Sequence, residues 1–324
     1  MVLSLKNLLS FMKLYLIRPR GFCAGVVRAI DTVEKALEKW GAPIYVKHEI
    51  VHNRHVVQSL KEKGAIFVED LKDVPKGGRV IYSAHGVPPS VREEAKKRNL
   101  FEIDATCGLV NRVHTAARRF AEEGYQIILI GHRNHVEIIG TKGEAPNATT
   151  VIEKVQDVQS LPFSKDTKMI YLTQTTLSLD DVEAITNELK KRYPKIESLP
   201  SSSICYATMN RQRGLKSIAK DVDVIFVIGD VKSSNSNRLK EVALNQNVLA
   251  HLINSEQEIQ KKWLKDVKAI GMTAGASTPE YIVQRCIETL KTMGVSVVEE
   301  IVYKDENVHF ALPEPLEENV CAST

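Results

Sequence analysis

The chain lacks any uninterrupted apolar run long enough to cross a bilayer, which takes about 20 residues. Its first residues, MVLSLKNLLSFMKLYLI, are mostly apolar, but Lys6 and Lys13 interrupt them and no small-residue cleavage site follows. We therefore expect neither a signal peptide nor a membrane partner. Because Met12 stands directly before the alternating stretch KLYLIR, we expect translation to begin there and residues 1–11 to be extra; a short helical extension is the alternative.

A strong excess of one charge is also missing, since 44 Lys and Arg residues face 40 Asp and Glu residues, a net charge of +4. Nucleic-acid-binding domains are more basic, so we expect no nucleic acid partner; the mild excess suits an anionic small molecule or an acidic protein. The five cysteines are scattered and form no C-x-x-C pair, which excludes a disulfide framework and a zinc ribbon and indicates a reducing cytoplasm. The nucleotide motifs G-x-x-x-x-G-K-[ST] and G-x-G-x-x-G are absent.

The chain does contain short β-branched runs that alternate with longer amphipathic stretches. This alternation predicts an α/β fold with parallel sheets. The predicted strands are 43–47, 79–84, 126–131, 168–173, 223–229 and 268–273, and the predicted helices are 28–40, 111–124, 179–192 and 278–294.

A weak internal repeat organises these elements. Cys23, Cys107 and Cys205 each open a helical stretch, and each is followed by an apolar strand that ends in a polar loop. The separation from Cys107 to His135 equals that from Cys205 to Ser233, 28 residues in each case. Repeated units pack together, so three units meeting at one centre would gather three thiols. The predicted units are 25–106, 107–203 and 204–295, with strand 12–24 packed on the third and a C-terminal extension at 296–324.

The three repeated cysteines differ from the other two. Cys286 falls on the apolar face of a helix and is expected in the core, and Cys321 lies in a polar tail. The repeated three lie at strand-to-helix junctions, where free N–H groups favour a thiolate. A single cysteine of this kind would be structural, but three in repeated context indicate a site for a metal that prefers thiolate ligands. A structural zinc site requires four ligands, whereas a cubane iron–sulfur cluster held by three cysteines leaves one iron open to substrate.

Polar side chains follow several predicted strands, at the sheet edge where ligands of parallel α/β proteins bind. The histidines are His52, His85 and His135, and the stretches KSSNSN (232–237) and TAGASTP (273–279) add hydroxyls, amides and N–H groups that suit phosphate. Each histidine alone is most often solvated, and Ser or Asn before a helix is often only a cap. An acid, Glu137, follows His135, and hydroxyls in TQTT (173–176) end another strand.

Eight motifs occur in order from about Lys13 to about Phe310: PRGFCAG, VHNR, SAHGV, DATC, TQTTLS, ICYAT-NRQ, SSNSNRL and TAGAS. Together they closely resemble the 4-hydroxy-3-methylbut-2-enyl diphosphate reductase family, which catalyses the last step of non-mevalonate isoprenoid biosynthesis. The resemblance implies a trefoil of three α/β units around a central cavity. It also implies one [4Fe–4S] cluster per chain, a cytoplasmic location and an external electron donor, a reduced ferredoxin or flavodoxin.

The same resemblance implies roles for individual residues. Cys23, Cys107 and Cys205 would ligate the cluster. The substrate diphosphate would be bound by His52, His85, His135, Ser233, Ser234, Asn235 and Ser277, and Thr175 would lie beside the substrate hydroxyl. Glu137, together with Thr175 and His135, would be catalytic, with Glu137 delivering a proton. The implied reaction is a reductive dehydroxylation that takes two electrons and two protons and yields isopentenyl and dimethylallyl diphosphate.

Three positions depart from the family's usual residues: Gly108 and Val136 stand where proline is common, and Lys232 stands where asparagine is common. They affect loop rigidity and local charge and remove no ligand or acid. Two other functions remain open on the residues alone. One is a zinc-dependent hydrolase of phosphate esters, which leaves the repeated cysteines unexplained and lacks H-E-x-x-H. The other is a non-catalytic module that binds phosphorylated ligands.

Overall fold

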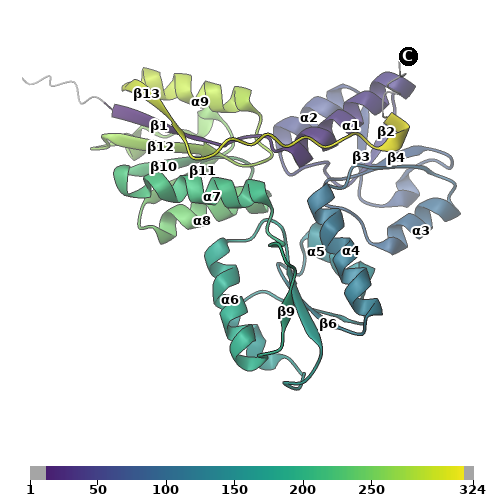
Figure 1. Ribbon diagram of the computed structural model, residues 1–324. Coiled ribbons are helices and arrows are strands. Elements are labelled where there is room, and N and C mark those ends of the chain that lie inside the picture. The colour runs from purple at the N-terminus through teal and green to yellow at the C-terminus, as the bar shows by residue number, and fades with distance from the viewer. Residues whose placement is uncertain (1–11, 317–324) are drawn as a thin grey trace, which may run out of the picture. The chain divides into compact units, whose positions relative to one another are not determined.

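The structure, a computed structural model, describes residues 12–316, so the expected extra segment 1–11 and Cys321 lie outside the described residues. The described chain contains three parallel sheets with helices between their strands (Figure 1). The contacts divide the chain into two compact bodies. The two-sheet body comprises Cys23–Thr208 and the residues from Asn307 onward; the single-sheet body comprises the residues up to Phe22 and Met209–Glu306.

The first sheet of the two-sheet body has the order β3-β2-β4-β5, with every pair parallel. Its strands are β2 (Ile44–Lys47), β3 (Ala65–Val68), β4 (Arg79–Tyr82) and β5 (Phe101–Asp104). The helices between and before them are α1 (Ala24–Trp40), α2 (Arg54–Glu62) and α3 (Pro89–Lys97). The side chain of Asn53 begins α2 by accepting hydrogen bonds from the N–H groups of His55 (3.0 Å) and Val56 (3.3 Å).

The second sheet of this body repeats the pattern with the order β7-β6-β8-β9. Its strands are β6 (Gln126–Ile130), β7 (Thr149–Ile152), β8 (Met169–Thr173) and β9 (Glu197–Ser198), and its helices are α4 (Gly108–Glu122), α5 (Val136–Glu144) and α6 (Leu179–Arg192). Apolar residues of α4 and α5 pack on one face and those of α6 on the other. Because both faces are covered, β6 reads as the continuous apolar run IILI.

The single-sheet body has the order β11-β10-β12-β1-β13, again parallel throughout. Its strands are β1 (Met12–Arg18), β10 (Val224–Ile228), β11 (Leu249–Ile253), β12 (Ala269–Ala274) and β13 (Val295–Val302). Helix α9 (Glu280–Thr292) covers one face, and α7 (Tyr206–Ile218) and α8 (Ser234–Asn245) cover the other (Figure 1). Strand β13 lies in the stretch that the sequence assigns to the C-terminal extension.

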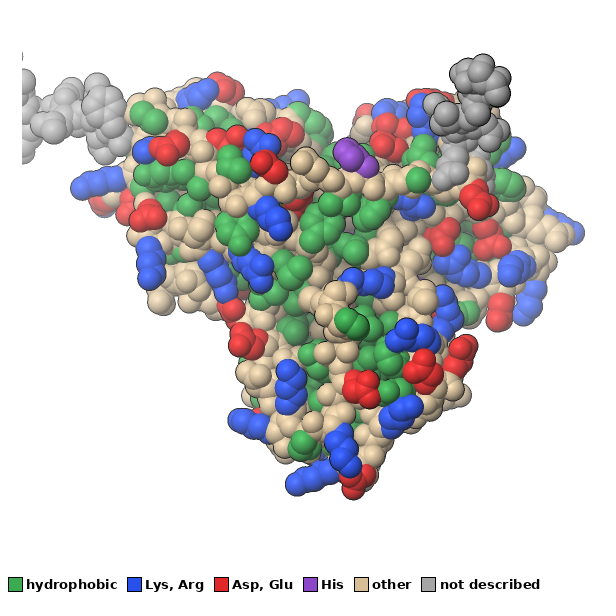
Figure 2. Space-filling view, in the orientation of Figure 1, with side chains coloured by type: hydrophobic (Ala, Val, Ile, Leu, Met, Phe, Trp, Pro, Cys, Tyr) green, Lys and Arg blue, Asp and Glu red, His purple; other side chains and the backbone are tan. Residues whose placement is uncertain are grey.

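The predicted α/β class with three parallel-sheet units is confirmed. Short 3₁₀ helices complete the described chain, at Leu71–Asp73, Val155–Ser160, Ala219–Asp221, Glu256–Glu258, Lys261–Leu264 and Glu314–Leu316. Over residues 12–316, no helix is long and apolar enough to span a bilayer. On the face drawn in Figure 2, basic and acidic side chains are interspersed, as the small net charge predicts.

Candidate active site

Three of the predicted histidines form one cluster in the two-sheet body. His52 follows β2, His85 follows β4, and His135 follows β6 as the residue that caps α5. The rings of His52 and His85 stack with centroids 4.3 Å apart, and the ring of His135 stands edge-on to both, at 5.7 and 5.8 Å. The parallel strands bring their carboxyl ends to one edge of each sheet, which places the three imidazoles together.

The hydrogen bonds of the cluster fix the direction of at least one ring. The Nδ1 atom of His135 accepts the N–H of Glu137 at 3.2 Å, so its Nε2 carries the proton when the ring is neutral. Burial, together with the neighbouring His52 and His132, lowers the pKa of His135 to about 4. Burial also lowers the pKa of His85 well below the usual histidine value. Without an anion, these two rings are therefore neutral hydrogen-bond donors at pH 7.

A buried carboxyl group lies on the first turn of α5. Glu137 is 2% exposed, and both of its oxygens accept hydrogen bonds from Thr175, one from the N–H at 2.6 Å and one from the Oγ1 hydroxyl at 2.9 Å. Burial raises the pKa of Glu137 to about 7, although both hydrogen bonds favour the ionised form. A carboxyl group with this pKa can donate a proton near neutral pH.

The three repeated cysteines all belong to the two-sheet body. Cys23 caps α1, Cys107 caps α4, and Cys205 directly precedes α7. None is in a disulfide, and their charges interact with one another. A Cβ atom built on Gly25 would lie only 2.6 Å from the Cys107 sulfur, so the first turn of α1 leaves room for that sulfur because residue 25 is glycine.

One expectation about these thiols is wrong. The helix N-termini were expected to favour the thiolate, yet burial raises the pKa of Cys107 to about 12 and that of Cys205 to about 11. Backbone N–H groups do face both sulfurs, from Leu109 and Val110 at Cys107, but desolvation outweighs them. A bound cation would favour the thiolate forms of Cys107 and Cys205.

The chemistry of the cysteine donors suits an iron–sulfur cluster, since soft thiolates are the ligands of such clusters. In a cubane cluster each thiolate binds a different iron. The three cysteines are outside disulfides, and backbone N–H groups face the sulfurs of Cys107 and Cys205; such thiols are the donors that a cluster takes.

The remaining predicted ligands belong to the single-sheet body. Ser233, Ser234 and Asn235 follow β10 at the start of α8, and Ser277 follows β12. The Ser233 hydroxyl accepts the N–H of Ser236 at 3.3 Å and so caps the helix. Asn235 is only 4% exposed, yet neither polar atom of its side chain has a hydrogen-bond partner among residues 12–316. A bound ligand would satisfy this buried amide.

These features define a class of protein: an α/β enzyme that carries a buried carboxyl group, an imidazole cluster and three cysteines outside disulfides in one body. The family model described as "LytB protein" matches residues 14–291. The chain is 65% identical over 305 residues to the 4-hydroxy-3-methylbut-2-enyl diphosphate reductase of Protochlamydia amoebophila (94% of this chain, 97% of the relative). It is 62% identical over 305 residues to that of Chlamydia pneumoniae (94% and 98%).

Solved structures agree with the sequence matches. The structure of the E-1-hydroxy-2-methyl-but-2-enyl-4-diphosphate reductase from Plasmodium falciparum matches with a TM-score of 0.92 and 48% identity, covering 94% of this chain and 97% of that one. A second, described as the terminal enzyme of the non-mevalonate pathway, matches with a TM-score of 0.62 and 31% identity over 87% of this chain and 100% of that one. The chain belongs to the 4-hydroxy-3-methylbut-2-enyl diphosphate reductase family.

Sequence analysis did not single out Gly25 or Arg28, although both lie in the helix that begins after Cys23. A side-chain clash appears only when the fold brings Cys107 beside Gly25. Arg28 bonds to backbone carbonyls far along the chain, at 104, 106 and 311, and no local sequence signal marks such contacts. The only hint that the sequence offers is that Gly25 ends the motif PRGFCAG and Arg28 lies three residues beyond it.

Proposed function

We propose that this chain reduces 4-hydroxy-3-methylbut-2-enyl diphosphate to isopentenyl and dimethylallyl diphosphate and water, with two electrons and two protons. The Glu137–Thr175 pair carries the proposal, because it is a buried acid with a pKa of about 7 in the same body as the three cysteines. Membership in the family and the close relatives support this reaction and substrate.

The diphosphate is bound by imidazoles and by helix-start hydroxyls and amides. His135 presents its Nε2–H, since its Nδ1 already accepts the Glu137 N–H. The buried Asn235 side chain, which has no hydrogen-bond partner among the described residues, supplies a donor and an acceptor. His52, His85, Ser233, Ser234 and Ser277 complete the proposed set. An anion next to the buried histidines raises their pKa, so their charge grows when the substrate is bound.

Glu137 delivers a proton to the reacting end of the substrate. With a pKa of about 7, its carboxyl group is available in the protonated form near neutral pH. The Thr175 hydroxyl donates to the carboxylate at 2.9 Å and holds it in place. Thr175 lies beside the substrate hydroxyl, so it can pass the proton on or orient the departing water.

Cys23, Cys107 and Cys205 would hold one [4Fe–4S] cluster. When bound, such a cluster supplies an open iron that acts as a Lewis acid on the hydroxyl and passes on electrons. The electrons come from a reduced ferredoxin or flavodoxin. Such donors are acidic, and the small positive net charge of this chain suits them.

Anaerobic turnover tests the proposal directly. The protein is loaded with iron and sulfide, mixed with the substrate and a chemical reductant, and the two products are quantified. We expect both products from the wild type, a loss of more than about a hundredfold in Glu137→Gln, and no product from Cys107→Ser. Cys286→Ala is the matched control, because that cysteine is buried in the single-sheet core and should leave turnover unchanged.

Two outcomes would replace the proposal. A protein that hydrolyses phosphate esters with zinc and without iron would be the hydrolase. A protein that binds the diphosphate with high affinity and yields no product, even with the cluster loaded, would be a binding module.

A further inference from the structure

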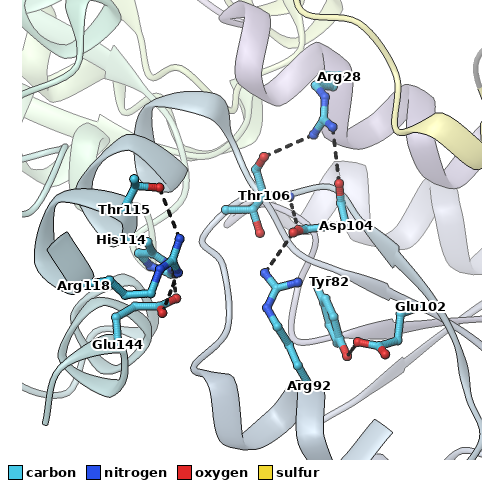
Figure 3. Close-up of polar contacts among 10 residues, drawn as sticks. All are labelled: Arg28, Tyr82, Arg92, Glu102, Asp104, Thr106, His114, Thr115, Arg118 and Glu144. Carbon is cyan, nitrogen blue, oxygen red and sulfur yellow. Dashed lines mark hydrogen bonds and ion pairs between the residues drawn. The ribbon is translucent and has the colours of Figure 1, made fainter. Parts of the chain in front are cut away.

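Arg28 makes three hydrogen bonds to backbone carbonyls that are far apart in the sequence. Its Nε donates to the carbonyl of Ala311 at 2.6 Å, its Nη1 to that of Thr106 at 3.1 Å and its Nη2 to that of Asp104 at 3.3 Å. Figure 3 shows the guanidinium above the 104–106 segment, with its bonds to Asp104 and Thr106. All of these residues belong to the two-sheet body.

The three contacts link the elements that carry two of the cysteines. Arg28 lies in α1, the helix that Cys23 caps, and Thr106 directly precedes Cys107. Arg28 therefore fixes the helix that begins after Cys23 against the turn that presents Cys107.

A second layer holds that turn in shape. The Asp104 carboxylate accepts the N–H of Thr106 at 2.9 Å and a guanidinium N–H of Arg92 at 2.8 Å (Figure 3). These two bonds brace the turn whose Asp104 and Thr106 carbonyls accept from Arg28. Among the hydrogen bonds of the described residues, Arg28 is the only side-chain link between the segment 104–106 and α1.

The third contact holds the C-terminal segment over the same place. Ala311 follows Phe310, whose ring would lie 4.0 Å from a Cβ atom on Gly25 and 3.8 Å from one on Gly108. The ring is therefore beside the first turns of both cysteine-capped helices. The Arg28 bond to the Ala311 carbonyl holds the segment 307–316 where this ring covers them.

We propose that Arg28 is a positioning residue for the cysteine site, which fixes the spacing between the Cys23 and Cys107 helices and holds the segment 307–316 over them. Lysine cannot fully replace Arg28. The planar guanidinium group donates to three carbonyls in three directions, and a single ammonium group cannot reach all three. For the effect on bound iron, the inference rests on the proposed function; the effect on the segment 307–316 does not.

The test uses the anaerobically loaded protein and two readouts other than activity. One is hydrogen exchange of the segment 307–316, and the other is the rate at which the cluster loses iron to a chelator. We expect Arg28→Gln to accelerate both by about tenfold or more, since a hydrogen bond from a charged group is worth roughly that factor or more. In Arg28→Lys, the exchange rate and the rate of iron loss should lie between those of Arg28→Gln and the wild type. This variant replaces Arg28→Gln in the test if Arg28→Gln does not fold.

Arg98→Gln is the matched control. Arg98 also donates to two backbone carbonyls, those of Lys72 (3.2 Å) and Val74 (2.8 Å), in the same body but at residues that carry no cysteine. It should lower the stability to unfolding and leave both readouts at the wild-type value. Equal exchange and iron loss in Arg28→Gln and Arg98→Gln would overturn the proposal. If the wild type binds no iron, the proposed function fails, and the exchange of 307–316 still decides whether Arg28 holds that segment.

Discussion

Replacing Thr175 with valine removes one of the two hydrogen bonds that stabilise the ionised form of Glu137. The hydroxyl donates to the carboxylate at 2.9 Å, while the N–H bond at 2.6 Å remains in the variant. A hydrogen bond to a charged group contributes about 1.5–3 kcal/mol, which corresponds to roughly one to two pH units. Because this bond favours the ionised form, its loss raises the pKa of Glu137 above about 7.

The assay is the pH dependence of kcat/KM, which reports ionisations of the free enzyme. Turnover needs the protonated acid, so the wild type should lose activity above about pH 7. In Thr175→Val this alkaline limb should move up by roughly one to two units, whatever the loss in maximal rate. Thr175→Ser keeps the hydroxyl and should leave the limb in place. If the alkaline limb of Thr175→Val is unchanged or moves to lower pH, the Thr175 hydroxyl does not lower the pKa of the catalytic acid.

Three further predictions concern stability, the cysteine site and the diphosphate. The folded-state pKa of Glu137, about 7, exceeds its ordinary value of 4.5, so stability is full below pH 4.5 and falls as the pH rises through about 7. Urea unfolding should show a loss of up to about 3 kcal/mol over this range, and Glu137→Gln should not show it. Gly25→Ala should abolish iron binding, because the new Cβ would lie 2.6 Å from the Cys107 sulfur, whereas Gly108→Ala, 3.8 Å from Phe310, should bind iron normally. Lys232→Asn should weaken diphosphate binding and reduce its salt dependence; an unchanged affinity at every salt concentration would show that this charge plays no part.

Periodicity and composition predict the central strands well, because these are buried on both faces. The runs at 126–131 and 223–229 are strands β6 and β10 almost to the residue. Strand β13 escapes prediction, since it is an edge strand with mostly exposed residues, and its two glutamates read as a polar segment. Helix α2 begins inside the stretch IVHNRHVV (50–57), to which the sequence assigns no helix; the side chain of Asn53 caps it.

The candidate site is predictable in its residue types and only partly in its chemistry. The spacing of Cys107 and His135 indicates a repeat, and the fold places both in one body. The raised pKa of Cys107 could not be predicted, because it comes from desolvation by residues that are distant in the sequence. The same holds for Glu137, whose burial raises its pKa against two hydrogen bonds from Thr175.

We propose that three cysteines hold a cluster whose fourth iron binds the substrate. Mössbauer spectroscopy of the anaerobically loaded protein, recorded with and without the substrate, tests this proposal. We expect about four irons per chain, of which one changes its signal when the substrate is added while the other three do not. The proposal would be contradicted by four equivalent irons whose signals do not change when the substrate is added, or by a protein that binds no iron.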